Sequence, residues 1–384
     1  MFHQMIILFS ILFLTACGNT PAVPDAHTSR RVKNIILMIG DGMGAEHRQL
    51  ARIIQHNKSA EQAMNRLLIK GEVRTSAFKG RVTDSAASAT AMATGHKTRN
   101  GIIGLGPDLN HFGNIVEDAK AKGKATGLVT TTHITHATPA AFVAHTGSRK
   151  NMLEIADQIS LAEVDVLMGG GEVYFLPESE TGCSVQAGKR TDGKNLIKML
   201  QSSGYSFICN ENMLKALDTQ FPRRVLGLFG AEGLQRPISP NLALMTDKSI
   251  ELLSQYPQGF FLMIEGGQID WASHDNDAEK LMQSLRGFDQ AVKVASDFAL
   301  SRDDTLIIVT ADHETGGLQI NRNSDGQGPF VDRMGVKFYI NWATHRHTAA
   351  NVPLIAAGPM SVLLEGDIDN TDIYQVMLKA LQSR

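Results

Sequence analysis

Short apolar runs rich in β-branched residues recur along this chain, and the segments between them have helical spacing. In residues 277–300, for example, Leu281, Leu285 and Phe288 follow one another at intervals of four and three and would share one helix face. Strands that are buried on both faces of a sheet have the composition of the apolar runs. The alternation predicts an α/β fold in which helices cover both sides of a mostly parallel sheet. The runs occupy residues 32–39, 127–131, 164–168, 225–229, 260–264, 305–310 and 352–357.

The length of 384 residues and the hydrophobic content of 43% are ample for a buried core, in one large domain or two smaller ones. The formal net charge is only −2, and no basic face or arm stands out along the sequence. The sequence therefore offers no general argument for nucleic-acid binding, and an anionic substrate would have to be attracted locally.

The N-terminal residues have the layout of a cleaved export signal. The apolar run at residues 6–14 is too short to span a bilayer, and small residues follow it. Residues 14–18 resemble the lipobox of bacterial lipoproteins, although residues 2–4 carry no lysine or arginine. We therefore expect a lipoprotein signal peptide at residues 1–16 and a lipid on Cys17 that holds the protein at a membrane. Simple cleavage without a lipid is the alternative.

Residues 17–31 contain prolines and small polar residues, which are typical of a tether. Residues 32–384 are then expected to form the catalytic domain. The protein is expected to be exported, and to be either periplasmic or a membrane-anchored lipoprotein.

Several of the apolar runs end at or just before a carboxylate. Asp41, Glu265 and Asp312 each lie within two residues of the end of a run. Ligands bind beyond the carboxyl ends of the strands in parallel sheets, so these acids are expected to meet at one edge of the sheet. The segment after the second run would bring histidines, a threonine and a guanidinium to the same edge, namely His133, His136, Thr138 and Arg149.

A capped helix is predicted directly after Thr83. Thr83, Asp84 and Ser85 are good N-terminal capping residues, an alanine-rich run follows them, and Gly95 is a suitable C-terminal stop. This interpretation places Ser85 at the positive end of a helix dipole, where unpaired N–H groups can bind a phosphoryl oxygen. On pattern alone such a helix is more often a packing element. The choice of Ser85 as nucleophile therefore depends on metal-ligand residues elsewhere.

Asp270 and His274 lie four residues apart, so a helical turn would put both on one face, where they can share a metal ion. A surface pair without a metal is the alternative. With Asp312, His313 and the histidines of residues 345–348, the nitrogen and oxygen ligands suffice for two zinc ions.

Together these residues resemble the bacterial alkaline phosphatase family. The resemblance runs from about Lys33 to Gly358, in the order in which the family carries its motifs. The motifs are Asp41, TDSAASATA at residues 83–91, HATPA at 136–140, Ser148 with Arg149, EGGQIDWASH at 265–274, TADHE at 310–314, and His347 with Thr348.

The resemblance implies a three-layer α/β/α sandwich that hydrolyses phosphate monoesters to an alcohol and inorganic phosphate. The reaction would pass through a phosphoserine on Ser85 and would use two zinc ions and one magnesium ion. By motif match, one zinc would be held by Asp270, His274 and His347. The second zinc, with Ser85 facing it, would be held by Asp41, Asp312 and His313. The magnesium would be held by Asp41, Thr138 and Glu265.

Arg149 would grip two phosphate oxygens in a bidentate fork, and Asp84 would orient Arg149. A simple helix cap is the alternative for Asp84. His136 and Trp271 would also lie near the substrate, at positions where some family members carry Asp and Lys. These two differences put magnesium affinity and phosphate affinity in question.

The segment between His313 and His347 is short, which leaves little room for the large insertions of some relatives. A dimer contact formed there by others therefore cannot be assumed, and a homodimer stays open. Once Cys17 is set aside for a lipid, Cys183 and Cys209 form an even pair. Export permits a disulfide between them, and two buried thiols are the alternative.

Two other functions stay open at this point. A relative in the same metal-dependent superfamily could cleave phosphodiesters, phosphonates or sulfate esters. Alternatively, a surface lipoprotein could bind zinc or phosphate without turnover.

Overall fold

The computed structural model describes residues 31–54, 63–221 and 223–383. The expected signal peptide, Cys17 and all but the last residue of the expected tether lie outside these ranges. Among the described helices, none combines the length and the apolar character that a bilayer-spanning segment requires.

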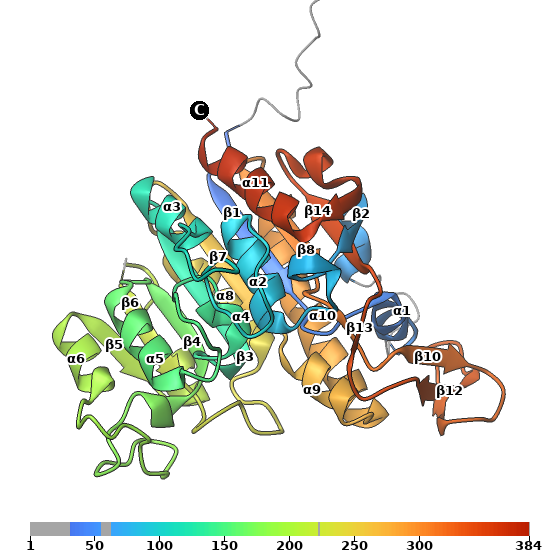
Figure 1. Ribbon diagram of the computed structural model, residues 1–384, viewed down its shortest axis with the longest axis horizontal. Helices are drawn as coiled ribbons and strands as arrows, with labels where there is room; N and C mark the ends of the chain where they lie inside the picture. The colour runs from blue at the N-terminus through green and yellow to red at the C-terminus, as the bar shows by residue number, and fades with distance from the viewer. Residues whose placement is uncertain (1–30, 55–62, 222, 384) are drawn as a thin grey trace, which may run out of the picture.

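The fold is built on one ten-stranded sheet with the strand order β15-β2-β14-β8-β1-β7-β3-β4-β6-β5 (Figure 1). Each predicted apolar run overlaps one of its strands. Neighbouring strands are parallel except at β14, which runs antiparallel to both β2 and β8. The mostly parallel sheet is therefore confirmed. The strands are β1 Asn34–Ile39, β2 Ile69–Arg74, β3 Ala125–His133, β4 Val166–Gly170, β5 Tyr205–Ile208, β6 Arg224–Leu228, β7 Phe260–Glu265, β8 Thr305–Thr310, β14 Val352–Ala357 and β15 Gly366–Asp369.

The four central strands β8, β1, β7 and β3 are buried along their whole length. Ile39 lies opposite Glu265 on one side and opposite Thr310 on the other, and Glu265 lies opposite Thr130. The carboxyl ends of β8, β1 and β7 therefore finish at one level, and β3 continues three residues further to His133. The residues that directly follow these strands in the chain therefore lie together at the carboxyl edge of the sheet.

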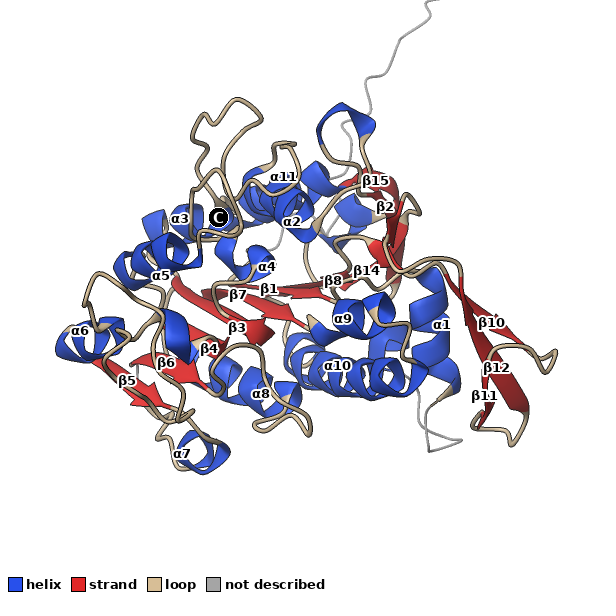
Figure 2. Ribbon diagram, turned by 60° about the horizontal axis from the view of Figure 1, so that its bottom comes forward, coloured by secondary structure: helices blue, strands red, loops and turns tan. Residues whose placement is uncertain are grey.

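Helices cover both faces of the sheet, as predicted (Figure 2). One face carries α2 Ser85–Thr94, α3 Ile115–Ala121, α4 Ala137–Ala140 and α11 Asn370–Leu381. The other carries α1 Ala45–Ile53, α8 Leu242–Leu253 and α10 Ala278–Leu300. The remaining α-helices are α5 Met152–Leu161, α6 Leu196–Ser202, α7 Glu211–Lys215 and α9 Gln268–His274, and short 3-10 helices lie at Ala63–Arg66, Phe78–Gly80, Glu172–Tyr174 and Ser361–Leu364.

The longest helix, α10, matches the predicted helix at residues 277–300. The side chain of Asp277 caps the N-terminus of α10 by accepting a hydrogen bond from the Lys280 N–H group at 3.0 Å. Leu281, Leu285 and Phe288 are buried as their spacing predicts. This apolar face packs the helix against the sheet and α8.

The segment between His313 and His347 forms a small arm instead of a large insertion. Its three antiparallel strands, β10 Leu318–Asn321, β12 Lys337–Trp342 and β11 Gln327–Val331, project from one side of the molecule (Figure 2). At the base of the arm, β9 Glu314–Thr315 pairs with β13 His347–Thr348, and His347 lies opposite Thr315. This short ladder returns His347 to the edge where Asp312 and His313 lie.

Cys183 and Cys209 are joined by a disulfide, with their Cα atoms 6.2 Å apart. The bond ties the loop around Cys183 to the residue that follows β5. The same loop is held from inside by the buried carboxylate of Glu172, which accepts hydrogen bonds from the N–H groups of Cys183 and Ser184, both at 2.8 Å.

Candidate active site

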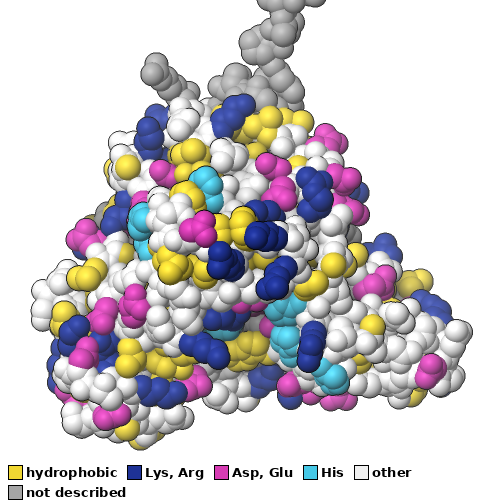
Figure 3. Space-filling view, viewed as in Figure 1, with side chains coloured by type: hydrophobic (Ala, Val, Ile, Leu, Met, Phe, Trp, Pro, Cys, Tyr) yellow, Lys and Arg dark blue, Asp and Glu magenta, His cyan; other side chains and the backbone are white. Residues whose placement is uncertain are grey.

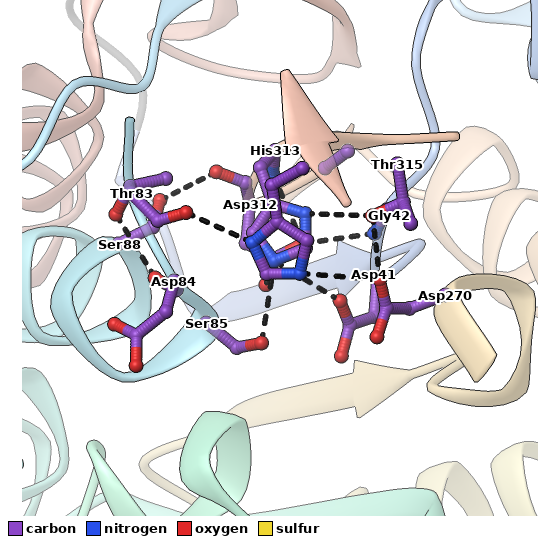
Figure 4. Close-up of polar contacts among 12 residues, drawn as sticks. Asp41, Gly42, Thr83, Asp84, Ser85, Ser88, Asp270, Asp312, His313 and Thr315 are labelled. Carbon is purple, nitrogen blue, oxygen red and sulfur yellow. Dashed lines mark hydrogen bonds and ion pairs between the residues drawn. The ribbon is translucent and has the colours of Figure 1, made fainter. Parts of the chain in front are cut away.

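Ser85 is the first residue of α2, as predicted. Asp84 caps this helix by accepting a hydrogen bond from Ala87 N–H at 2.9 Å, and Gly95 ends it in the left-handed conformation with φ of 75°. The Ser85 hydroxyl points away from the helix toward His313, and its Oγ lies 3.3 Å from His313 Nε2 (Figure 4). A buried hydroxyl at a helix N-terminus is thus held beside an imidazole.

Asp84 contacts both the helix and Arg149, with a different oxygen for each. Its Oδ1 accepts the capping bond, whereas its Oδ2 accepts hydrogen bonds from Gly101 N–H at 2.9 Å and from Arg149 Nη1 at 3.2 Å. Arg149 Nη2 lies 3.2 Å from His136 Nε2. The two interpretations of Asp84 are therefore compatible, because one carboxylate both caps α2 and contacts Arg149.

Three buried carboxylates meet at the carboxyl edge of the sheet. Both oxygens of Asp41, Oδ2 of Asp312 and Oε1 of Glu265 have no hydrogen-bond partner in the part of the chain that the structure describes. Burial raises the pKa of Asp41 well above its usual value, and the charges of Asp312, Asp270 and Glu265 act in the same direction. Burial also raises the pKa of Asp312, and it raises the pKa of Glu265 to about 7. Such a group of acids is stable in its ionised form only with cations among them.

His274 and His347 are oriented with their Nε2 atoms toward each other. His274 Nδ1 lies 2.6 Å from the carbonyl of His345, and His347 Nδ1 lies 2.9 Å from the carbonyl of Thr83, so each Nδ1 carries the proton. The two Nε2 atoms lie 3.0 Å apart, and they are 3.4 Å and 3.5 Å from Asp270 Oδ1. The lone pairs of the two Nε2 atoms and the Asp270 carboxylate converge on one point, where a cation would fit. Metal-binding histidines are commonly oriented in this way, by a hydrogen bond from Nδ1 to a backbone carbonyl.

A second convergence lies around His313. Its Nε2 is 3.5 Å from Asp41 Oδ1 and 3.2 Å from Asp312 Oδ2, and these atoms lie close to the Ser85 hydroxyl. Burial lowers the pKa of His313 well below its usual value. The imidazole is therefore neutral at physiological pH and able to donate its lone pair to a metal.

The third group contains Asp41, Glu265 and His136, whose candidate ligand atoms all lie within 4.8 Å of one another. The Thr138 hydroxyl is buried without a hydrogen-bond partner among the described residues. Burial lowers the pKa of His136 well below its usual value. The edge of its ring faces Trp271, with ring centroids 6.0 Å apart. His136 thus lies among the residues predicted to surround magnesium, and Trp271 lies beside it.

The site residues predicted from the sequence therefore lie at or beside the carboxyl edge of the sheet. The sequence analysis missed several threonines that hold these site residues in place. Thr315 donates a hydrogen bond to Asp270 Oδ1 at 2.5 Å and lies 3.2 Å from His313 Nδ1, which couples two of the groups. Thr130 and Thr132 both contact Glu265 Oε2. Alternation along β3 puts Thr130 and Thr132 on one face, and this signal could have identified them.

Comparison with known proteins places this geometry in a family. The chain matches the family described as alkaline phosphatase over residues 32–339. It is 36% identical to alkaline phosphatase 3 of Bacillus subtilis, over 98% of this chain and 96% of that protein. Among solved structures, alkaline phosphatase from the Antarctic bacterium TAB5 superposes with a TM-score of 0.81 at 32% identity, covering 92% of this chain and 100% of the other. A histidine-to-aspartate mutant of the TAB5 enzyme, described with Mg bound in its M3 site, superposes with a TM-score of 0.79 at 32% identity and covers 93% of this chain and 100% of the other.

A parallel sheet whose carboxyl edge gathers a helix-terminal serine and clustered metal ligands defines a metal-binding hydrolase. The chain belongs to the alkaline phosphatase family, and its reaction is the hydrolysis of phosphate monoesters.

Proposed function

We propose that this phosphatase works through a phosphoserine on Ser85, with two zinc ions and one magnesium ion. The observation that carries the proposal is the convergence of the Ser85 hydroxyl, the neutral His313 ring and the unpartnered oxygens of Asp41 at one buried point. Bound cations would offset the charge of these buried carboxylates.

The residues present fit the three ions. Asp270, His274 and His347 would hold one zinc through a carboxylate and two Nε2 lone pairs. Asp41, Asp312 and His313 would hold the other zinc. Asp41, Glu265 and Thr138 would hold magnesium. When bound, zinc lowers the pKa of a nearby hydroxyl or water and neutralises charge on phosphoryl oxygens.

The residues of the chain itself account for the bond changes. Ser85 releases its hydroxyl proton to solvent and its oxygen forms a bond to phosphorus as the ester P–O bond breaks, and the alcohol leaves with a proton from solvent. Water then attacks phosphorus and the bond to Ser85 Oγ breaks, which releases inorganic phosphate and restores the serine hydroxyl with a proton that the attacking water gives up. The N–H groups at the start of α2 that are not taken up by the Asp84 cap would receive the phosphoryl oxygens, and Arg149 would donate to two of these oxygens.

Magnesium binding is expected to be weak because of His136. A neutral imidazole contributes no negative charge and is a nitrogen ligand, whereas magnesium prefers oxygen ligands. The similar enzyme from TAB5 is described with Mg in its M3 site after a histidine was replaced by aspartate, and this supports the expectation. Zinc is expected to compete for the same site at high concentration.

We also propose export of the protein, with a lipid on Cys17 that anchors it to a membrane. The support is the order of the apolar run, the small residues and Cys17 in the sequence. Cys17→Ser should move the protein from the membrane fraction to the soluble fraction of cells without changing its activity. Retention of Cys17→Ser in the membrane fraction would contradict lipid anchoring.

The activity is tested by the release of p-nitrophenol from p-nitrophenyl phosphate and from its bis-ester. We expect much faster hydrolysis of the monoester. A chelator should abolish turnover, because bound zinc would activate the nucleophile and neutralise charge on the phosphoryl oxygens. Added zinc should restore turnover. Faster cleavage of the bis-ester would instead favour a diesterase, and unchanged turnover in chelator would contradict metal dependence.

A further inference from the structure

A fourth group of metal-ligand residues lies outside the active site. The candidate ligand atoms of His111, Glu117 and His145 all lie within 4.8 Å of one another. Histidine side chains on the face drawn in Figure 3 occur in two separate areas. The three residues come from different segments: the loop before α3, the first turn of α3, and the segment after α4.

His145 is oriented so that its Nδ1 faces a backbone carbonyl and its Nε2 faces Asn114 and Glu117. Its Nδ1 lies 2.8 Å from the carbonyl of Gly104, so Nδ1 carries the proton and Nε2 has the lone pair. Asn114 Oδ1 accepts hydrogen bonds from the N–H groups of Val116 and Glu117, which fixes its amide with Nδ2 3.4 Å from His145 Nε2. Both neighbours therefore favour the tautomer with a lone pair on Nε2, and a metal ion bound there would replace the long contact with the Asn114 amide.

Glu117 presents one oxygen to the same point. Its Oε2 accepts a hydrogen bond from Asn114 N–H at 3.0 Å as part of the capping box of α3. Its Oε1 lies 3.3 Å from His145 Nε2. Two donors bound to one zinc ion in tetrahedral geometry, each ~2.0 to 2.1 Å from the metal, are about 3.3 Å apart. The separation in the structure is therefore that of two ligands on one ion.

His111 supplies a third donor. Its ring lies over that of His145, with centroids 3.9 Å apart and planes inclined by 35°. The His111 side chain is exposed, and one of its ring nitrogens lies within 4.8 Å of the ligand atoms of Glu117 and His145. Two imidazoles and one carboxylate form a known protein ligand set for zinc, with a fourth position left for water.

We propose that His111, Glu117 and His145 form an additional zinc site, separate from the catalytic ions. Bound zinc would fasten the loop at residues 101–113 to α3 and to the segment that leads into Arg149. That loop already contacts the segment through Ile103 N–H to the Thr146 carbonyl at 3.0 Å, and through Arg149 N–H to the Gly101 carbonyl at 2.7 Å. The ion would thus stabilise a support of the phosphate-binding arginine. The alternative is an ion pair between His145 and Glu117 that binds no metal.

The test compares wild type with His111→Gln and a matched control, His96→Gln. His96 is also an exposed histidine, and its ring stacks on Phe112 at 3.8 Å, but it lies outside the proposed site. Each protein is equilibrated against a series of buffered free-zinc concentrations, and bound zinc per chain is counted by elemental mass spectrometry. We expect His111→Gln to bind one zinc ion fewer than wild type, and His96→Gln to match wild type.

Hydrogen exchange locates the lost ion. Zinc should slow amide exchange in residues 101–113 of wild type and His96→Gln, and should have no such effect in His111→Gln. Hydrolysis of p-nitrophenyl phosphate at saturating zinc should be retained in all three proteins, which shows that each is folded. Equal zinc counts in wild type and His111→Gln, or the same loss in His96→Gln, would overturn the proposal.

Discussion

His274 and His347 direct their Nε2 atoms at each other across 3.0 Å, although they lie 73 residues apart in the chain. The contact depends on two different pieces of local structure. His274 is the last residue of α9, and His347 begins β13 at the base of the arm. Each ring is fixed by a backbone carbonyl, so the pair is arranged before any ion is bound.

This arrangement predicts that His347→Gln lowers both zinc content and activity. We expect the loss of one bound zinc ion. We also expect a decrease in kcat/KM on the order of 100-fold or more, because that zinc ion would no longer stabilise the negative charge on the phosphoryl oxygens. His345→Gln is the neighbouring control: the His345 carbonyl holds the His274 ring, whereas the His345 ring contacts the backbone carbonyl of His274 at 2.9 Å and the Asn276 amide. Zinc analysis and steady-state kinetics check both. A normal zinc content in His347→Gln would show that this residue is not a ligand.

The two oxygens of Asp84 predict that its roles can be separated. Asparagine caps helices as well as aspartate does, so Asp84→Asn should keep the stability of α2 while it loses the charged contact with Arg149. Asp84→Ala should lose both, with an additional cost of about 1 kcal/mol in the free energy of unfolding. We expect a raised KM in both variants. Denaturant unfolding and kinetics measure the two effects, and equal stability losses with an unchanged KM would contradict this division.

The sequence predicted the central strands because burial on both faces gives an uninterrupted apolar run. It missed β2, β5 and β15, which lie at or near the sheet edges and mix exposed with buried positions. In β2, for example, Lys70 and Glu72 interrupt the apolar pattern. Edge strands are specified by their partners more than by their own composition.

The site was predictable to a similar degree and for a similar reason. Asp41, Glu265 and Asp312 follow buried strands, and parallel strands bring their carboxyl ends together. The role of Thr315 could not be predicted, because its two contacts depend on how β9 and β13 pair. The disulfide was left open for the same reason, since two cysteines in a sequence carry no information on the distance between them.

Replacing His136 by aspartate should strengthen magnesium binding. His136 lies in one group with Asp41 and Glu265, and a carboxylate there adds negative charge and a hard oxygen ligand. A magnesium titration of metal-depleted enzyme reloaded with zinc should show activation at lower magnesium concentration in His136→Asp than in wild type. His136→Asn separates the effect of charge from that of size. If His136→Asp binds magnesium no more tightly than wild type, His136 is not near that ion.

The disulfide predicts a large effect of cysteine replacement on stability. The cysteines are 26 residues apart, and opening a loop of this length costs roughly 3 to 4 kcal/mol in the chain-entropy model. Cys183→Ser and Cys209→Ser should both lower the free energy of unfolding, and the addition of reductant should lower that of wild type but not theirs. Denaturant unfolding with and without reductant is the measurement. Two free thiols in denatured, unreduced wild type would show that the bond does not form.

The central claim is that Ser85 carries the phosphoryl group during turnover. Its hydroxyl lies 3.3 Å from His313 and at the N-terminus of α2, where backbone N–H groups can receive the phosphoryl oxygens. The most direct measurement is peptide mapping by mass spectrometry after acid quenching of enzyme that is turning over a phosphate monoester, with Ser85→Ala as control. We predict one phosphoryl group on Ser85 in wild type and none in the variant, whose rate falls by several orders of magnitude. Near-normal activity in Ser85→Ala without any phosphorylated peptide would contradict the account.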